Sequence, residues 1–275
     1  MLRTLLRIAV ALLFSAILLV TVAFRLTGGR WMTVTTPSMG RTAPVGTVLL
    51  VRPDPHPQVG EFVVFHPPGR PHDTYAHRLV AERPDGFSTR GDANGAPDPW
   101  TVPSTAIQGR VIARLWWLGW VLRMVPDLAL GGLVTMVVSA LFPDRHRLAV
   151  RLALGSLTVA LTIWLIRPFV RLVVLMNYAV DGQSTTTVVP TGLMPVTVHA
   201  VHGSRATLDP GQIGVLHSAL AGPNGHFGIS YLPHLTSWWW LVTALGWLMP
   251  LIIAMVVGGA SSRRRQLVKA VVQSQ

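Results

Sequence analysis

The sequence predicts a membrane protein in which about four transmembrane α-helices carry two β-rich segments outside the membrane. Half of its 275 residues are hydrophobic, only 12% are charged and the mean hydropathy is +0.47. This composition is too apolar for an ordinary soluble domain, and its low charge excludes a disordered chain. Long apolar runs alternate with shorter β-branched runs bounded by proline and glycine, and this alternation predicts helices across the membrane and strands outside it.

The charged residues and the missing cysteines exclude several classes of protein. The net charge is +12, but Lys269 is the only lysine, and the arginines are scattered without interleaved aromatic residues. We therefore expect no nucleic-acid partner, because such proteins concentrate their basic residues on one face. The chain has no cysteine. This excludes disulfides, thiolate zinc sites and a cysteine nucleophile.

Four apolar runs are candidates for transmembrane helices, for which about 20 residues are needed to cross a bilayer core about 30 Å thick. Ile8–Phe24 has no small-residue cleavage site after it, so we predict an uncleaved anchor. Leu148–Ile166 and Trp239–Val257 are also long enough. Leu128–Phe142 is short and needs Met124–Asp127 or a locally thinner bilayer to cross.

The basic flanks of these runs predict the orientation of the chain in the cytoplasmic membrane. With four spans, most of the flanking basic residues fall on one side, which is cytoplasmic by the positive-inside rule. Arg167 and Arg171 fall on the opposite side, where they snorkel or begin an interfacial helix. The residues on the cytoplasmic side are Arg3, Arg7, Arg145, Arg147, Arg263, Arg264, Arg265 and Lys269.

The predicted spans divide the chain into five parts. These are an anchor (1–25), an extracytoplasmic domain (26–126), two transmembrane helices (127–166), a second extracytoplasmic segment (167–236), and a transmembrane helix with a basic cytoplasmic tail (237–275). Both extracytoplasmic segments contain runs typical of strands: VGTVLLV and VGEFVVFH in the first, VTVHAVHG and HFGISYL in the second. The aromatic run Leu115–Val125 is too short to span, so we expect an interfacial helix there.

Three stretches of the first extracytoplasmic segment contain the residue types of an activated hydroxyl: Thr36–Gly40, Tyr75–Val80 and Thr89–Trp100. A serine nucleophile needs a base that titrates near neutrality, either a histidine or a desolvated lysine. Lys269 lies beyond the last predicted span, which leaves histidine. A carboxylate normally fixes the histidine tautomer, and spacing alone does not select it. The candidates are Asp54, Glu61, Asp73, Glu82, Asp85, Asp92 and Asp98.

In their order and in their residues these stretches resemble the type I signal peptidase family, in particular its archaeal and endoplasmic-reticulum-type branch. The resemblance covers roughly Ile8 to Val111 and rests on four motifs. In that branch a histidine stands before the arginine of the third motif, where the common bacterial branch has lysine. The motifs here are Ser38–Met39, Val59–Phe65, His77–Val80, and Gly91–Asp92 with Asn94 and Asp98.

The resemblance implies a role for each matching residue. Ser38 is implied as the nucleophile, His77 as the general base and Asp98 as the carboxylate that orients His77. Asp92 is implied as structural support, with an exchange of roles between the two aspartates left open. The Ser38 amide and the Thr36 hydroxyl are implied as oxyanion donors. Pro37 departs from the family, which usually has glycine before the serine.

The resemblance also implies a β-rich domain of signal-peptidase type and a membrane-bound serine endopeptidase (a hydrolase). Its substrates would be signal-peptide-bearing precursor proteins in secretion, and membrane lipids and the secretion machinery are expected partners. We expect no cofactor and no metal, since a loop of undetermined shape separates His66 from His72 and Asp73. Two alternatives stay open: a dedicated processing peptidase for one secreted or pilus-like substrate, and a non-catalytic membrane scaffold.

Overall fold

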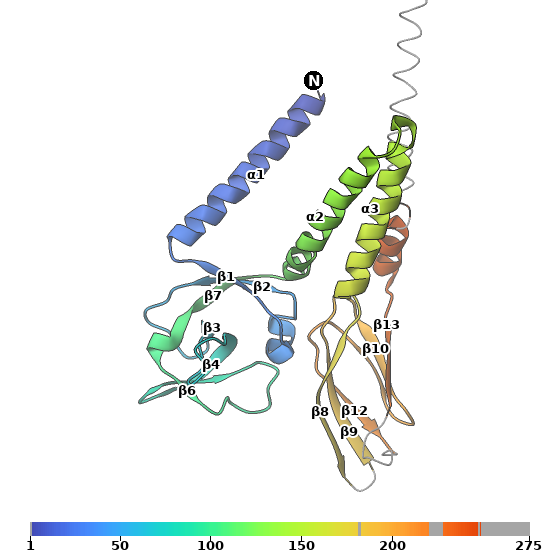
Figure 1. The fold of residues 1–275 in the computed structure, drawn as a ribbon. Helices are drawn as coiled ribbons and strands as arrows, with labels where there is room; N and C mark the ends of the chain where they lie inside the picture. The colour runs from blue at the N-terminus through green and yellow to red at the C-terminus, as the bar shows by residue number, and fades with distance from the viewer. Residues whose placement is uncertain (1, 181–182, 220–227, 247, 249–275) are drawn as a thin grey trace, which may run out of the picture. The chain divides into compact units, whose positions relative to one another are not determined.

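The computed structural model describes residues 2–180, 183–219, 228–246 and 248 (Figure 1). The described residues up to Val121, together with Val170–Leu232, form one compact unit. Leu122–Phe169 and the described residues after Leu232 belong to a second unit. Each unit is taken by itself below.

Three of the described helices are long and apolar enough to cross a membrane: α1 (Leu2–Leu26), α2 (Leu118–Ala140) and α3 (Asp144–Ile166). Helix α1 contains the first predicted span and α3 the run that ends at Ile166. The described side chains of α1 are almost all exposed, Leu12 and Phe14 among them. An apolar helix that exposes its whole circumference suits a lipid environment. The remaining candidate, Trp239–Val257, falls largely outside the described residues.

The expectation of a separate interfacial helix over Leu115–Val125 is wrong. Leu115 ends strand β7, and α2 begins at Leu118 and continues through Pro126 to Ala140. Helix α2 therefore has 23 residues. It begins ten residues before Leu128, where the short span was predicted to start. A continuous helix satisfies its backbone hydrogen bonds internally, which an apolar environment requires.

The first β-rich part is a curled seven-stranded antiparallel sheet with the strand order β1-β2-β7-β3-β4-β5-β6 (Figure 1). Register shifts interrupt the pairing of β2 with β7, β3 with β7, and β4 with β5, and such bulges bend a sheet. The strands are β1 (Arg30–Thr33), β2 (Val48–Arg52), β3 (Phe62–Phe65), β4 (Tyr75–Arg83), β5 (Gly86–Arg90), β6 (Thr101–Val102) and β7 (Ile107–Leu115).

Both faces of this sheet carry buried apolar side chains. One cluster centres on Met39, Leu49 and Val64, and the other on Phe65 and Leu79. Side chains of β4 alternate between the two: Ala76 packs on the first cluster, whereas Tyr75 and Leu79 belong to the second. His77 therefore lies on the face of Tyr75 and Leu79, and Arg78 on the opposite face.

The first turn of α2 is fixed to the loop before β2. Trp120 is only 2% exposed, and its Nε1 donates a hydrogen bond to the Val45 carbonyl oxygen at 3.0 Å. The amide of Gly119 donates to the carbonyl oxygen of Gly46, and a Cβ at Gly119 would lie 2.6 Å from that oxygen. Only glycine permits this close approach of two backbones.

The second β-rich part is a sandwich of two three-stranded sheets, ordered β11-β10-β13 and β12-β9-β8. Val188 and Leu216 of one sheet meet Val196, Val198 and Leu208 of the other in a buried core. Its strands are β8 (Leu172–Val180), β9 (Gln183–Pro190), β10 (Val196–Ala200), β11 (Arg205–Leu208), β12 (Gly214–Ser218) and β13 (Ile229–Pro233).

In the second unit, α2 and α3 approach closely. A Cβ at Gly131 would lie 2.6 Å from the Thr158 hydroxyl oxygen, so a small residue is needed where the helices cross. The guanidinium of Arg151 donates to the hydroxyl of the buried Ser139 at 3.0 Å. This bond gives the charge a polar partner among apolar side chains.

Trp120→Ala is expected to lower the free energy of unfolding by about 3–5 kcal/mol, because it empties a packed site and leaves the Val45 carbonyl without its donor. Trp116→Ala is the matched control, since Trp116 is 42% exposed. Thermal unfolding of both variants in detergent micelles measures the difference. Equal midpoints would contradict this account of the α2 attachment.

Candidate catalytic site

Ser38 lies on a short 3-10 helix, η1 (Pro37–Thr42), between β1 and β2. Pro37 begins the helix with its fixed φ, and Gly40 takes a φ of +53° that breaks the helical path. The Ser38 side chain is half-buried, and its Oγ lies 3.5 Å from Oγ1 of Thr36. Near the start of a helix an amide has no intrahelical acceptor, so the Ser38 N–H has none within η1.

His77 lies in the middle of β4, where it pairs with Val63 of β3. The residue is 3% exposed, and its ring packs edge-on against Phe65 and Tyr75. Nδ1 lies 2.6 Å from Oδ2 of Asp98. A carboxylate accepts, so Nδ1 carries the hydrogen and Nε2 is left as the basic nitrogen.

Asp98 is held in place by Thr89, a residue that the sequence did not single out. The Thr89 hydroxyl donates to Oδ2 of Asp98 at 2.6 Å, and the Asp98 amide donates to the Thr89 carbonyl oxygen at 2.8 Å. The Asp98 side chain is 7% exposed and that of His77 4%. A buried carboxylate is retained when it is paired and hydrogen-bonded, as here. The position of Thr89, just before the Gly91–Asp92 motif, is the only sequence signal for it.

Asp92 contacts other residues than His77. Its two carboxylate oxygens accept from Nε and Nη2 of Arg78 at 2.9 and 2.7 Å, and Oδ2 also accepts from the Thr42 hydroxyl at 2.6 Å. Burial raises the pKa of Asp92, but the hydrogen bonds from Arg78 and Thr42 and the charges of Arg78 and Arg90 outweigh it and lower the pKa below the usual value. The hydrogen bond with Asp92 raises the pKa of Arg78, against the opposing effect of burial.

The Gly91–Asp92 motif also contacts the serine turn directly. The amide of Ala93 donates to the Ser38 carbonyl oxygen at 2.8 Å. A Cβ at Gly91 would lie 2.5 Å from that same oxygen, so the approach requires glycine. Together with the Thr42–Asp92 bond, these contacts hold η1 against the end of β5, and η1 also lies against β4.

The structure thus brings Ser38, Thr36, His77, Asp98 and Asp92 into one region of the sheet. Among the hydrogen bonds of the described residues, the Ser38 hydroxyl has Thr36 as its partner rather than His77. Catalytic hydrogen bonds often tighten only when substrate binds. Proton transfer from the Ser38 hydroxyl to Nε2 of His77 would therefore require these two atoms to come together when substrate binds.

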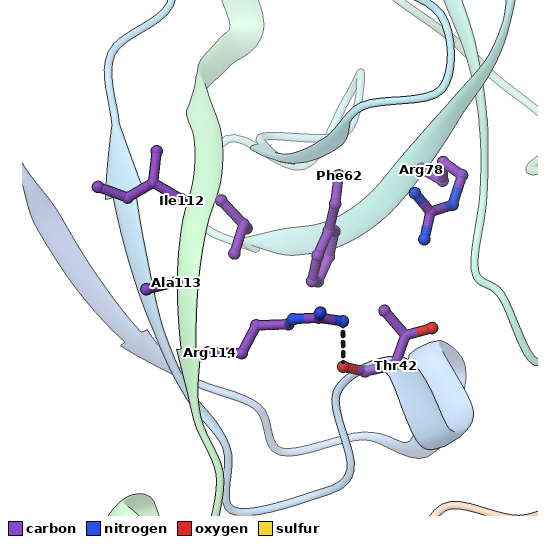
Figure 2. A pocket seen from close by; sticks show the side chains of 7 residues that line it. Thr42, Phe62, Arg78, Ile112, Ala113 and Arg114 are labelled. Carbon is purple, nitrogen blue, oxygen red and sulfur yellow. Dashed lines mark hydrogen bonds between the residues drawn. The ribbon is translucent and has the colours of Figure 1, made fainter.

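An open hollow of about 340 Å³ lies on the face of the sheet opposite His77 (Figure 2). Arg114 extends into it and donates to the Thr42 carbonyl oxygen at 2.9 Å. Ser38, His77 and Asp98 do not line this hollow, so it is separate from the candidate chemistry. Its lining residues are Thr42, Phe62, Arg78, Val111, Ile112, Ala113 and Arg114.

His66, the first residue after β3, has protein partners at both ring nitrogens. Nδ1 of His66 lies 2.7 Å from the Asp73 carbonyl oxygen, and its Nε2 contacts Gln108. Across the part of the chain that the structure describes, no group of three histidine, aspartate or glutamate side chains is arranged to hold a metal ion.

Residues 5–93 match the family model described as signal peptidase, peptidase S26. The matched segment contains Ser38, His77 and Asp92 and ends before Asp98. The match supports the type I signal peptidase family for this part of the chain. No curated protein matches the sequence.

Asp92→Asn tests the charge network around the serine turn. A lowered folded-state pKa means that the Asp92 carboxylate stabilises the fold above its ordinary pKa of about 3.9 and that this contribution is lost as the pH falls below it. Because the Arg78–Asp92 pair is partly exposed to solvent, the variant is expected to lose about 0.5–1 kcal/mol of stability at pH 7. It should also lose less stability than the wild type on acidification below about pH 4.

Thermal midpoints recorded from pH 7 down to pH 3 measure both effects. Asp85→Asn, in the exposed turn between β4 and β5, is the control and should follow the wild type. An Asp92→Asn variant as stable as the wild type at neutral pH would contradict the role of this ion pair.

Proposed function

We propose that this chain is a membrane-bound serine endopeptidase that removes signal peptides from exported precursor proteins at the extracytoplasmic face of the cytoplasmic membrane. The buried hydrogen bond between His77 and Asp98 carries the proposal. This hydrogen bond lies in the sheet that also supports the serine turn. His77 is within the segment that matches the signal peptidase model, and Asp98 follows shortly after its end. A buried imidazole whose tautomer is fixed by a carboxylate is the arrangement that a histidine base requires.

In the proposed reaction, Ser38 Oγ attacks the scissile carbonyl carbon while Nε2 of His77 takes the hydroxyl proton. Asp98 keeps the hydrogen on Nδ1 and stabilises the imidazolium that forms. The Ser38 amide and the Thr36 hydroxyl would donate to the oxyanion, each typically worth a few kcal/mol of barrier. The imidazolium then protonates the departing amine, and a water activated by His77 hydrolyses the acyl-enzyme.

The geometry near Ser38 agrees with these roles. The Thr36 hydroxyl oxygen lies 3.5 Å from the Ser38 hydroxyl oxygen, so one of the two proposed oxyanion donors is next to the nucleophile. The Asp98 hydrogen bond is short and shielded, and in such surroundings a charged hydrogen bond is stronger than in water. Arg78, the next residue on β4, is paired with Asp92 and points to the opposite face, so His77 is the residue of β4 that can supply the base.

The substrate would arrive with its apolar segment in the bilayer and its cleavage region extended near the headgroups. Helix α1 ends at Leu26, and η1 begins at Pro37, so the nucleophile follows closely after a candidate span. An extended peptide would bind by strand addition. The signal-peptidase resemblance implies small residues at the first and third positions before the cut.

Ser38→Ala and His77→Ala should each abolish precursor cleavage by the purified protein in detergent micelles, because they remove the nucleophile and the base. Ser104→Ala and His56→Ala change exposed residues elsewhere and should cleave normally. A serine-reactive acylating probe should label the wild type at Ser38 and fail to label Ser38→Ala. Normal cleavage by either active-site variant, or an unlabelled wild type, would remove the proposal in favour of a scaffold.

Asp98→Asn and Asp92→Asn distinguish the orienting role proposed for Asp98 from the structural role proposed for Asp92. An amide in place of Asp98 favours the wrong tautomer of His77, and kcat should fall by about 10³- to 10⁴-fold with the fold retained. Asp92→Asn should act mainly through stability, with a much smaller loss of kcat in the folded fraction. Steady-state cleavage of a fluorogenic precursor peptide measures both. The reverse order of the two effects would give the orienting role to Asp92.

A further inference from the structure

The turn between β11 and β12 (Asp209–Ile213) contacts the serine turn. Nη2 of Arg41 lies 2.9 Å from Oδ2 of Asp209. Gly211 is buried and has a φ of +77°. A Cβ at Gly211 would lie 2.7 Å from the carbonyl carbon of Gly40 and 3.0 Å from the amide nitrogen of Arg41. The two backbones therefore touch, two and three residues beyond Ser38.

A second contact joins the β-sandwich to the same loop. The guanidinium of Arg171 lies 6.0 Å from the centre of the Trp120 ring, a distance at which a cation is attracted to the ring face. Trp120 in turn donates to the Val45 carbonyl oxygen. The loop that begins with η1 is thus supported at Gly40–Arg41 by one turn of the sandwich and at Val45 through Trp120.

We infer that the sandwich of strands β8–β13 positions the nucleophile turn, with Gly211 and Asp209 as positioning residues. This inference rests on the proposed function. The position of η1 sets how closely Ser38 Oγ approaches Nε2 of His77, and these two atoms are not yet hydrogen-bonded in the described structure. Because Gly40 is part of η1, its contact with Gly211 affects the distance between Ser38 Oγ and Nε2 of His77.

Gly211 carries most of this effect. A side chain there would meet backbone atoms, which cannot rotate away, so η1 and the Asp209–Ile213 turn must move apart. The Arg41–Asp209 pair is exposed on both sides, at 65% and 52%, so it adds little to stability and acts chiefly on the placement of the turn.

Gly211→Ala is the main test and Gly69→Ala its control. Gly69 has nearly the same φ, +74°, but a Cβ there would meet nothing within 4 Å, so the control carries the backbone strain without the clash. We expect kcat for precursor-peptide cleavage to fall about 10- to 100-fold in Gly211→Ala with little change in KM, because displacement of a reacting group by about 1 Å costs up to that much. Gly69→Ala should stay within about twofold of the wild type.

The thermal midpoints of both variants are measured in parallel. If both glycine variants have the same kcat, or if Gly211→Ala raises KM alone, the inference is overturned.

A charge exchange provides a test that does not depend on how well Gly211→Ala folds. Arg41→Asp and Asp209→Arg should each lower kcat about two- to fivefold, as expected for an exposed ion pair.

The double variant Arg41→Asp/Asp209→Arg should restore kcat to within about twofold of the wild type. Two independent losses that add in the double variant would contradict a direct pairing. Failure of the proposed function looks different, because the wild type itself would then neither cleave the precursor peptide nor be labelled at Ser38.

Discussion

In the proposed reaction, the other site residues depend on the hydrogen bond between Nδ1 of His77 and Asp98. It fixes the hydrogen on one imidazole nitrogen and so decides which nitrogen can act as a base. Both side chains are nearly inaccessible to water, and the bond is supported by the Thr89 hydroxyl. The strands β4 and β5 hold His77 and Thr89 in register, so the sheet itself supplies the rigidity that the chemistry needs.

The two aspartates of the Gly91–Asp98 loop divide their tasks according to the face of the sheet on which their partners lie. His77 and Arg78 are neighbours on β4 and therefore point to opposite faces. Asp98 meets the first and Asp92 the second. One loop thus supports the imidazole and, through Asp92 and Thr42, the serine turn. The paired guanidinium keeps Asp92 ionised, which leaves it an acceptor at neutral pH.

Local patterns in the sequence identified much of this arrangement. The apolar runs predicted α1 and α3, and the β-branched runs predicted β2, β3 and β10. Such elements can be predicted because the pattern of hydrophobic residues within a short segment indicates its secondary structure and its burial. The start of α2 was not predicted, since Trp116 and Trp117 look interfacial and only the contact of Trp120 with Val45 shows where the helix begins. Thr89 and the choice between Asp92 and Asp98 depend on pairing across strands, which no spacing along the chain reveals.

Pro37 departs from the pattern of the family that the chain resembles, but this departure is compatible with the proposed chemistry. Proline lacks the N–H that a glycine would offer, and its ring fixes φ near −65°. At the first position of a helix that N–H has no intrahelical acceptor in any case, and the fixed φ suits the helix. Pro37 stands there at the start of η1, directly before Ser38. The proposed backbone donor to the oxyanion is the amide of Ser38, which the proline leaves in place. The proline therefore reduces the freedom of the unbound turn without removing the donor.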